Sequence, residues 1–453
     1  MTTLTQLPDF SGSKYKKKID DLRRLMVLDL TASQYINGRG AARLFATLLK
    51  AYRASIDDDK WSTKPFLKQS IEEKRRFNLV LAAIFDFVSN IEYCHARLVN
   101  SDWIYCNRPD TPLPRVYYAF LKQCPRCCLD IGLGSRISGA QHKPSSHHIG
   151  EITTTLSALT LSLLGSSAPK PVKIAVISKQ SHDVDAIAFR DDLLVLFEIK
   201  ASPMVTFPLC FDLSASLKQE KNGEVTDYPQ HSLVDVQIEH EKLNLFIPHR
   251  NWMIPLAGSG EASWPYEPAI RFFSHSPNFL DYLDAWLEIF YAYAVPKSLR
   301  KGREIILGYL ANGWGDEIDS NKTKPGLGRT DDIKKGTYQM LKFGAYYNDD
   351  DFSIPVKSVL VANLDPLFLR ADYLDKLIDV RWAKKERFIE EGTDQSKLWI
   401  ESRYLHDLYE AIVAFNAPLI NDQTLADVFD FAATDKALLD GKLDALLLEW
   451  SGV

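Results

Sequence analysis

Residues 193–197, LLVLF, form an uninterrupted apolar run that lies close to turn residues. A short run of this kind is typical of a strand that is buried on both faces, inside a sheet with helices on either side. The sequence therefore predicts an α/β fold with a mixed central sheet flanked by helices. The strand continues into two charged residues, Glu198 and Lys200, whose side chains share a face because alternate residues of a strand do.

A third charged residue, Asp185, precedes the apolar part of an adjacent strand, predicted over 184–189. The turn at 190–192, Arg-Asp-Asp, makes the two strands a hairpin. Two carboxylates that converge at one end of a hairpin can hold a hard divalent cation, and a nearby lysine can stabilise a developing oxyanion. This combination suits phosphodiester hydrolysis. Asp183 competes for the role of Asp185; we prefer Asp185 because the apolar run begins directly after it. The alternative is a surface hairpin with a chance pattern of charges.

Helical patterns flank this hairpin on both sides. Residues 147–165 predict a helix with Glu151 in its first turn and an end at Gly165. Residues 329–347 predict a second helix, capped by Thr330 or Asp331 and carrying Gln339. A strand follows over 356–363. The predicted order is therefore a helix with a glutamate, strands with an aspartate and an ExK pair, a helix with a glutamine, and a strand.

This order and these residues resemble the PD-(D/E)XK nuclease superfamily over residues 147–202 and 329–363. The resemblance implies a restriction-endonuclease-like core. It also implies roles for five residues. Asp185 corresponds to the motif aspartate, Glu198 to the metal-binding acid and Lys200 to the catalytic lysine. Glu151 and Gln339 correspond to polar residues on the two core helices, and the metal that Asp185 and Glu198 would bind is Mg²⁺. The residue before the aspartate is Val184, where many members have proline.

Six regions follow from the patterns along the chain. Residues 1–90 predict a helical N-terminal region, 91–148 a cysteine-containing region, and 149–202 the first part of the nuclease core. Residues 203–330 predict an insertion that forms a module with a separate function, since long insertions are rarely structureless. The core resumes over 331–365, and 366–453 predict a mostly helical C-terminal region.

The insertion and the helix after it carry a set of basic residues. Glycines among them let the backbone approach a phosphate, and the cations neutralise it, so this set predicts contacts to DNA. The alternative is a solvated basic loop. The residues are Lys297, Arg300, Lys301, Arg303, Lys322, Lys324, Arg329, Lys334 and Lys335.

The cysteines predict a structural zinc site. Cys124 and Cys127 have CxxC spacing, which is common in tetrahedral zinc knuckles, and Cys94 with Cys106 would complete four ligands. His142 and His147 are alternative partners for the CxxC pair, and Cys128 is an additional cysteine beside it. Plain buried thiols are the other interpretation.

Together these features favour a sequence-specific type II restriction endonuclease, which the resemblance implies to be Mg²⁺-dependent and often homodimeric on double-stranded DNA. A narrower resemblance to the ApaLI-like group rests on no separate motif. The alternatives are a RecB-like DNA exonuclease and a zinc-containing DNA-binding protein without cleavage. The net charge is −5, so DNA contacts require local basic patches. The N-terminus lacks a signal peptide pattern and no apolar run spans a membrane, so we expect a cytoplasmic protein.

Overall fold

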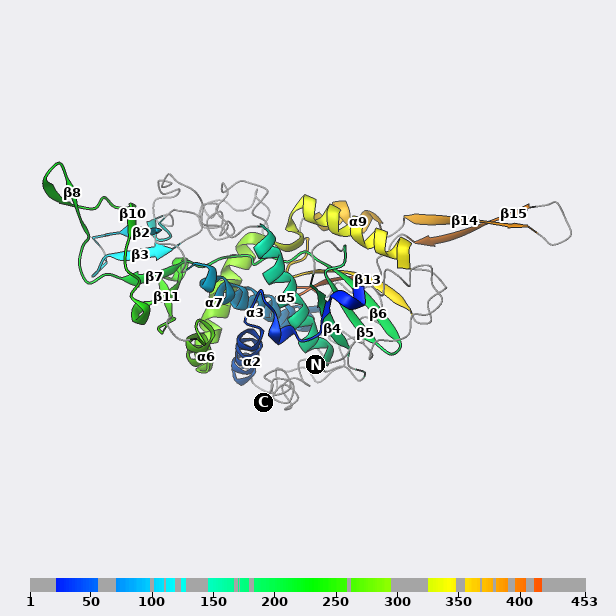
Figure 1. Ribbon diagram of the computed structural model, residues 1–453, viewed down its shortest axis with the longest axis horizontal. Helices are drawn as coiled ribbons and strands as arrows, with labels where there is room; N and C mark the ends of the chain where they lie inside the picture. Colours follow the sequence, from blue (N-terminus) through cyan, green and yellow to red (C-terminus); the bar gives the residue numbers. More distant parts are fainter. Residues whose placement is uncertain are drawn as a thin grey trace.

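The computed structural model describes residues 22–55, 71–97, 102–109, 111–118, 124–127, 146–166, 170, 172–178, 183–258, 262–294, 325–347, 355–366, 369–377, 380–389, 396–404 and 411–417. They form a mixed α/β structure with two six-stranded sheets and two separate hairpins (Figure 1). Within these residues, none of the helices combines the length and the apolar composition that crossing a bilayer requires.

The first sheet has the strand order β1-β4-β5-β6-β13-β16. Strands β4 (Lys173–Ile177), β5 (Ala186–Arg190) and β6 (Leu193–Ile199) form an antiparallel meander. Strand β13 (Val356–Ala362) then pairs in parallel with β6, and β16 (Ala411–Ala414) pairs in parallel with β13. The hairpin predicted between β5 and β6 is confirmed, with Arg190 opposite Leu193.

Strand β6 is buried along its whole length, as its apolar sequence predicts. Val195 and Phe197 pack into a core that contains helices α3 (Ile71–Arg97) and α5 (Ser146–Ser166). Leu194 and Leu196 point the other way, into a core with α9 (Thr330–Tyr347). The helices predicted over 147–165 and 329–347 are therefore confirmed, and they cover opposite faces of the sheet.

Helix α9 approaches β13 closely because residue 336 is glycine. A Cβ at Gly336 would lie 2.7 Å from Leu360 Cδ1, which is closer than real side chains come. A larger residue would therefore require either the buried Leu360 side chain or the helix to shift.

The N-terminal region is helical in large part. Helices α2 (Gly38–Ala54) and α3 are confirmed, and they pack with α6 (Tyr266–Phe273) and α7 (Ser276–Ala294). The prediction of a helical region over 1–90 is wrong in part, because β1 (Met26–Val27) pairs with β4 at the edge of the first sheet. A free sheet edge can recruit a short apolar segment whatever its helical spacing.

The second sheet is antiparallel throughout, with the order β10-β2-β3-β7-β11-β12. Strands β2 (Asp102–Cys106) and β3 (Arg115–Tyr118) come from the cysteine-containing region. The others follow the nuclease-like hairpin: β7 (Leu209–Asp212), β10 (Leu233–Asp235), β11 (Asn244–Ile247) and β12 (Trp252–Pro255). Strand β7 pairs with β3, so two regions that are distant in sequence build one sheet.

The described part of the C-terminal region is not mostly helical, and this prediction is wrong there. After the short helix α10 (Arg370–Tyr373), strands β14 (Arg381–Ile389) and β15 (Ser396–Tyr404) pair along their full length. This hairpin extends away from the rest of the molecule (Figure 1). Lysine, glutamate and arginine favour helices, but cross-strand pairing overrides such propensities. A second hairpin, β8 (Lys218–Lys221) with β9 (Glu224–Asp227), lies at the opposite end.

Candidate active site

Asp185 lies immediately before β5, against the end of β6. Its Oδ2 accepts a hydrogen bond of 2.7 Å from the Ile199 N–H. Its own N–H donates to the Phe197 carbonyl at 3.0 Å. Backbone pairing and side chain therefore fix the carboxylate beside the strand that carries Glu198 and Lys200.

Glu198 is only 5% exposed and its carboxylate forms an ion pair with the Lys200 ammonium. The Lys200 N–H donates to the Val361 carbonyl at 2.8 Å, so the residue after β6 is held against β13. The structure thus brings Asp185, Glu198 and Lys200 together, as the sequence predicts.

The three groups perturb one another strongly. Burial, followed by the charge of Asp185, raises the pKa of Glu198 to about 7. Burial also raises the pKa of Asp185, whereas Lys200 and the Ile199 N–H oppose that shift. Burial lowers the pKa of Lys200, but Glu198 and Asp185 outweigh it, and the net pKa is raised. Perturbed groups that act on each other inside one site are typical of functional sites.

Two further carboxylates lie near this trio. Glu151, on the first turns of α5, contributes to the raised pKa of Asp185 after burial. It also lies 3.7 Å from Nδ1 of His147, which is exposed. Asp332, in the first turn of α9, interacts with Lys200, and burial raises its pKa. Glu151 is predicted from the sequence, whereas Asp332 is not; its signal is an acidic residue in the first turn of the second predicted helix.

Asp183 and Gln339 form a separate pair. Gln339 Nε2 donates to Asp183 Oδ1 at 3.4 Å, and Lys342 forms an ion pair with the same carboxylate. Gln339 Oε1 is buried and has no hydrogen-bond partner among the described residues. Asp183 is exposed and still contributes to the raised pKa of Glu198, after burial and Asp185, so it lies at the margin of the site.

Carboxylate oxygens are the kind of ligand that a hard divalent cation binds, although no three carboxylates of this site lie within 4.8 Å of one another in the described part of the chain. Asp185 and Glu198 offer carboxylate oxygens, the ligands that Mg²⁺ prefers, and Glu151 lies within electrostatic reach. Their mutual repulsion in a largely buried site is the kind of strain that a bound cation relieves.

Helix α3 holds the segment that follows Lys200 in place through hydrogen bonds. Asp86 of α3 accepts a hydrogen bond of 3.0 Å from the Met204 N–H and another of 3.4 Å from Asn363 Nδ2. Asn363 Oδ1 in turn accepts from the Ser202 N–H at 3.0 Å. These bonds lock residues 202–204 against the end of β13, directly after Lys200.

Three of the predicted DNA contacts lie in the described residues. Arg329 pairs with Asp332 at 3.4 Å. Lys334 Nζ lies 5.6 Å from the centroid of the Tyr373 ring. Lys335 is exposed and interacts with Asp332. The other six residues lie outside the described residues: Lys297, Arg300, Lys301, Arg303, Lys322 and Lys324.

The predicted cysteine site is assembled only in part. The Sγ atoms of Cys106, Cys124 and Cys127 all lie within 4.8 Å of one another, and all three residues are buried. Cys94 is not among them. It lies in α3, and its thiol donates to the Asn90 carbonyl, 3.2 Å away. A helical cysteine satisfied in this way packs as an apolar residue.

His147, one of the alternative zinc partners, does not join this cluster. His147 pairs with Glu151 instead, and Cys128 and His142 lie outside the described residues. The three clustered cysteines pack with Tyr117, Cys210 and Phe246 at the second sheet.

Comparisons with protein-family models, with curated proteins and with solved structures found no match to this chain. What the chain does is therefore argued from the site itself.

Proposed function

We propose that this chain is a divalent-metal-dependent nuclease that cleaves double-stranded DNA at a specific sequence, as type II restriction endonucleases do. The observation that carries the proposal is the convergence of Asp185, Glu198 and Lys200 where β5 begins and β6 ends. The element order α5-β4-β5-β6-α9-β13 supports it, because the superfamily that the sequence resembles has a helix, three strands, a helix and a strand in this order.

The site suits hydrolysis of a phosphodiester. Mg²⁺ held by Asp185 and Glu198 would lower the pKa of a bound water and offset charge on the phosphoryl group. Lys200 keeps its proton, since the adjacent carboxylates raise its pKa overall, although burial lowers it. Its ammonium therefore contributes positive charge where the attacked phosphate gains negative charge. Glu151 extends the acidic side of the site and would help to hold the cation or its water.

Double-stranded DNA, magnesium and a homodimer are the partners that this proposal implies. The exposed lysines of α9 support a DNA contact next to the site, because Lys335 interacts with Asp332 and Asp332 with Lys200. Sedimentation with and without a DNA duplex tests the dimer.

A cleavage assay on two substrates tests the function. Purified protein with Mg²⁺ should cut closed circular plasmid and linear phage DNA into discrete bands, and the Glu198→Gln variant should leave both intact. Degradation of the linear DNA alone, as a smear, would identify a RecB-like exonuclease. Intact DNA together with a mobility shift would identify a DNA-binding protein that does not cleave.

A further inference from the structure

Three clustered cysteines leave a tetrahedral metal site one ligand short, and the backbone of His231 pairs with the residue before Cys106. We propose that Cys106, Cys124, Cys127 and His231 form a Cys₃His zinc site, with His231 as the fourth ligand. This site is separate from the carboxylate site and does not depend on the proposed nuclease activity.

The spacing of the thiols fits a tetrahedral zinc ion. With Zn–S bonds of about 2.3 Å, two sulfurs of a tetrahedron lie about 3.8 Å apart. The Sγ atoms of Cys106 and Cys127 are 3.7 Å apart. That separation is far longer than a disulfide bond, which is about 2.05 Å. Three buried sulfurs at this spacing also match the soft donors that select zinc over magnesium.

The backbone brings His231 to the cluster. The His231 N–H donates to the Tyr105 carbonyl at 2.9 Å, and Tyr105 precedes Cys106. The Tyr105 N–H donates back to the Ser232 carbonyl at 2.8 Å. On the other side of the histidine, Gln230 Nε2 lies 3.5 Å from Cys127 Sγ. His231 thus lies between Gln230, which contacts Cys127, and Ser232, which pairs with the residue before Cys106.

Two polar side chains reach the cluster at Cys127 Sγ. Gln230 Nε2 lies 3.5 Å from this sulfur. Arg108 Nη1 lies 3.9 Å from the same sulfur. Three thiolates, one neutral histidine and Zn²⁺ carry a net charge of −1. Donors such as Arg108 and Gln230 satisfy that charge in the way outer-shell partners of zinc sites do.

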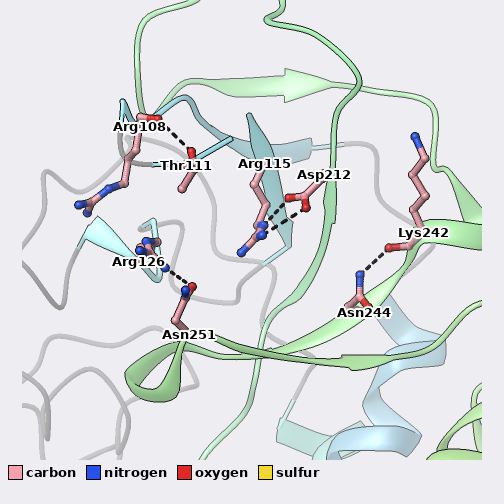
Figure 2. Close-up of polar contacts among 8 residues, drawn as sticks. All are labelled: Arg108, Thr111, Arg115, Arg126, Asp212, Lys242, Asn244 and Asn251. Atoms are coloured by element: carbon pink, nitrogen blue, oxygen red, sulfur yellow. Dashed lines mark hydrogen bonds and ion pairs between the residues drawn. The ribbon is translucent and has the colours of Figure 1, made fainter. Parts of the chain in front are cut away.

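Such a site would join three separate pieces of chain. Cys106 is the last residue of β2, Cys124 and Cys127 flank a tight turn, and His231 lies just before β10. Arg126 in that turn also donates to Asn251 in the turn between β11 and β12 (Figure 2). Zinc would hold the turn and the 229–232 segment against the sheet, where regular strand pairing has ended.

The His231 backbone decides which variant tests the proposal. Its φ is +66°, a region that histidine and asparagine tolerate better than most residues. His231→Asn keeps this tolerance and removes the metal-binding ring. His231→Cys replaces the ring by a fourth thiolate. Cys94→Ser and His240→Asn are matched controls, because neither residue belongs to the proposed site.

Metal analysis of the purified full-length chain should find about one zinc per chain in the wild type and in both controls. In competition with a chelator, His231→Asn should weaken zinc binding by more than about 100-fold, since loss of an outer-shell partner alone costs 10- to 100-fold. His231→Cys should restore most of the affinity. Zinc bound equally tightly by wild type and His231→Asn would exclude the histidine, and a metal-free wild type would exclude the site.

X-ray absorption of the wild-type zinc protein gives a second measurement that needs no variant. The expected shell is three sulfurs at about 2.3 Å and one imidazole nitrogen at about 2.0 Å. Four sulfurs, or three sulfurs with a water oxygen, would overturn the assignment of His231.

Discussion

Two groups of buried carboxylates in this protein have similarly raised pKa values, but their neighbouring groups differ. Asp86 and Glu92 lie in helix α3, and Glu198 lies at the end of β6. Burial raises the pKa of each of the three to about 7. Asp86 accepts from Trp286 Nε1 at 2.8 Å and from two further neutral donors. Glu92 accepts from the Tyr266 hydroxyl and from the Asn37 N–H at 3.4 Å.

The carboxylates of the candidate site have charged neighbours instead. Glu198 pairs with the Lys200 ammonium, and Asp185 and Asp183 act on it as like charges. Neutral donors satisfy a carboxyl group in either protonation state and leave no demand for a ligand. Crowded like charges beside one ammonium can gain from a divalent cation. Burial and a raised pKa therefore do not separate the two groups; the charge of the partners does.

The largest expected effect is on catalysis. Glu198→Gln or Lys200→Ala should lower the cleavage rate by about 1,000-fold or more, since either change removes roughly 4 kcal/mol of charge stabilisation at the phosphate. DNA binding should remain measurable, because phosphate and base contacts lie elsewhere. Gel assays of plasmid cleavage, with exposed Glu224→Gln as control, measure the effect. Wild-type rates in both variants would remove these residues from the site.

The same comparison predicts opposite effects on stability. Asp86→Ala should lower the free energy of unfolding by about 3 kcal/mol, because it leaves the buried Trp286 and Met204 N–H groups without an acceptor. Glu198→Gln should leave stability unchanged or raise it by up to about 1 kcal/mol, because it removes a like charge beside Asp185. Urea unfolding without divalent metal measures both. A larger loss in Glu198→Gln than in Asp86→Ala would reverse the roles assigned to the two groups.

Asp86 also predicts a pH dependence with a definite sign. Burial raises its folded-state pKa from 3.8 to about 7, so the folded protein takes up a proton that the unfolded chain releases. Stability contributed by Asp86 therefore rises as pH falls from about 8 toward 4. Between pH 8 and pH 6, the wild type should gain roughly 1 kcal/mol relative to Asp86→Asn, which does not titrate. A difference that stays constant with pH would show that Asp86 remains ionised in the folded state.

The parts of the fold that local patterns determine were predictable from the sequence. The apolar run at 193–197 predicts a strand buried on both faces, and the spacing of its charged end brings Glu198 and Lys200 to one face. Helices α5 and α9 follow from their apolar periodicity. Asp185 could be placed because a two-residue turn fixes the register of the β5–β6 hairpin.

The remaining features depend on pairings between distant segments. Nothing local indicates that β3 pairs with β7, or that His231 lies beside Tyr105. Cys94 has a plausible spacing for zinc, but the helix that contains it continues to Arg97 and directs its thiol to a backbone carbonyl. Asp332 was missed because acidic residues in the first turn of a helix are common without any function.

The smallest expected effect is on the salt dependence of DNA binding, and it concerns the two lysines that follow Asp332 on α9. Lys334 and Lys335 occupy the first turns of α9, where N–H groups and the helix dipole favour an anion. Lysine is a point charge, better suited to a phosphate than to a base edge. Lys335→Ala should flatten the plot of log affinity against log salt by about one unit, for specific and non-specific DNA alike.

Lys334→Ala should flatten this plot less, because the Lys334 ammonium already lies over the Tyr373 ring. Lys221→Ala, on the exposed β8–β9 hairpin, is the control that should leave the slope unchanged. A change in the sequences that are cut, at constant slope, would assign Lys335 to base recognition, and the acidic site would then lack a phosphate-binding cation on α9.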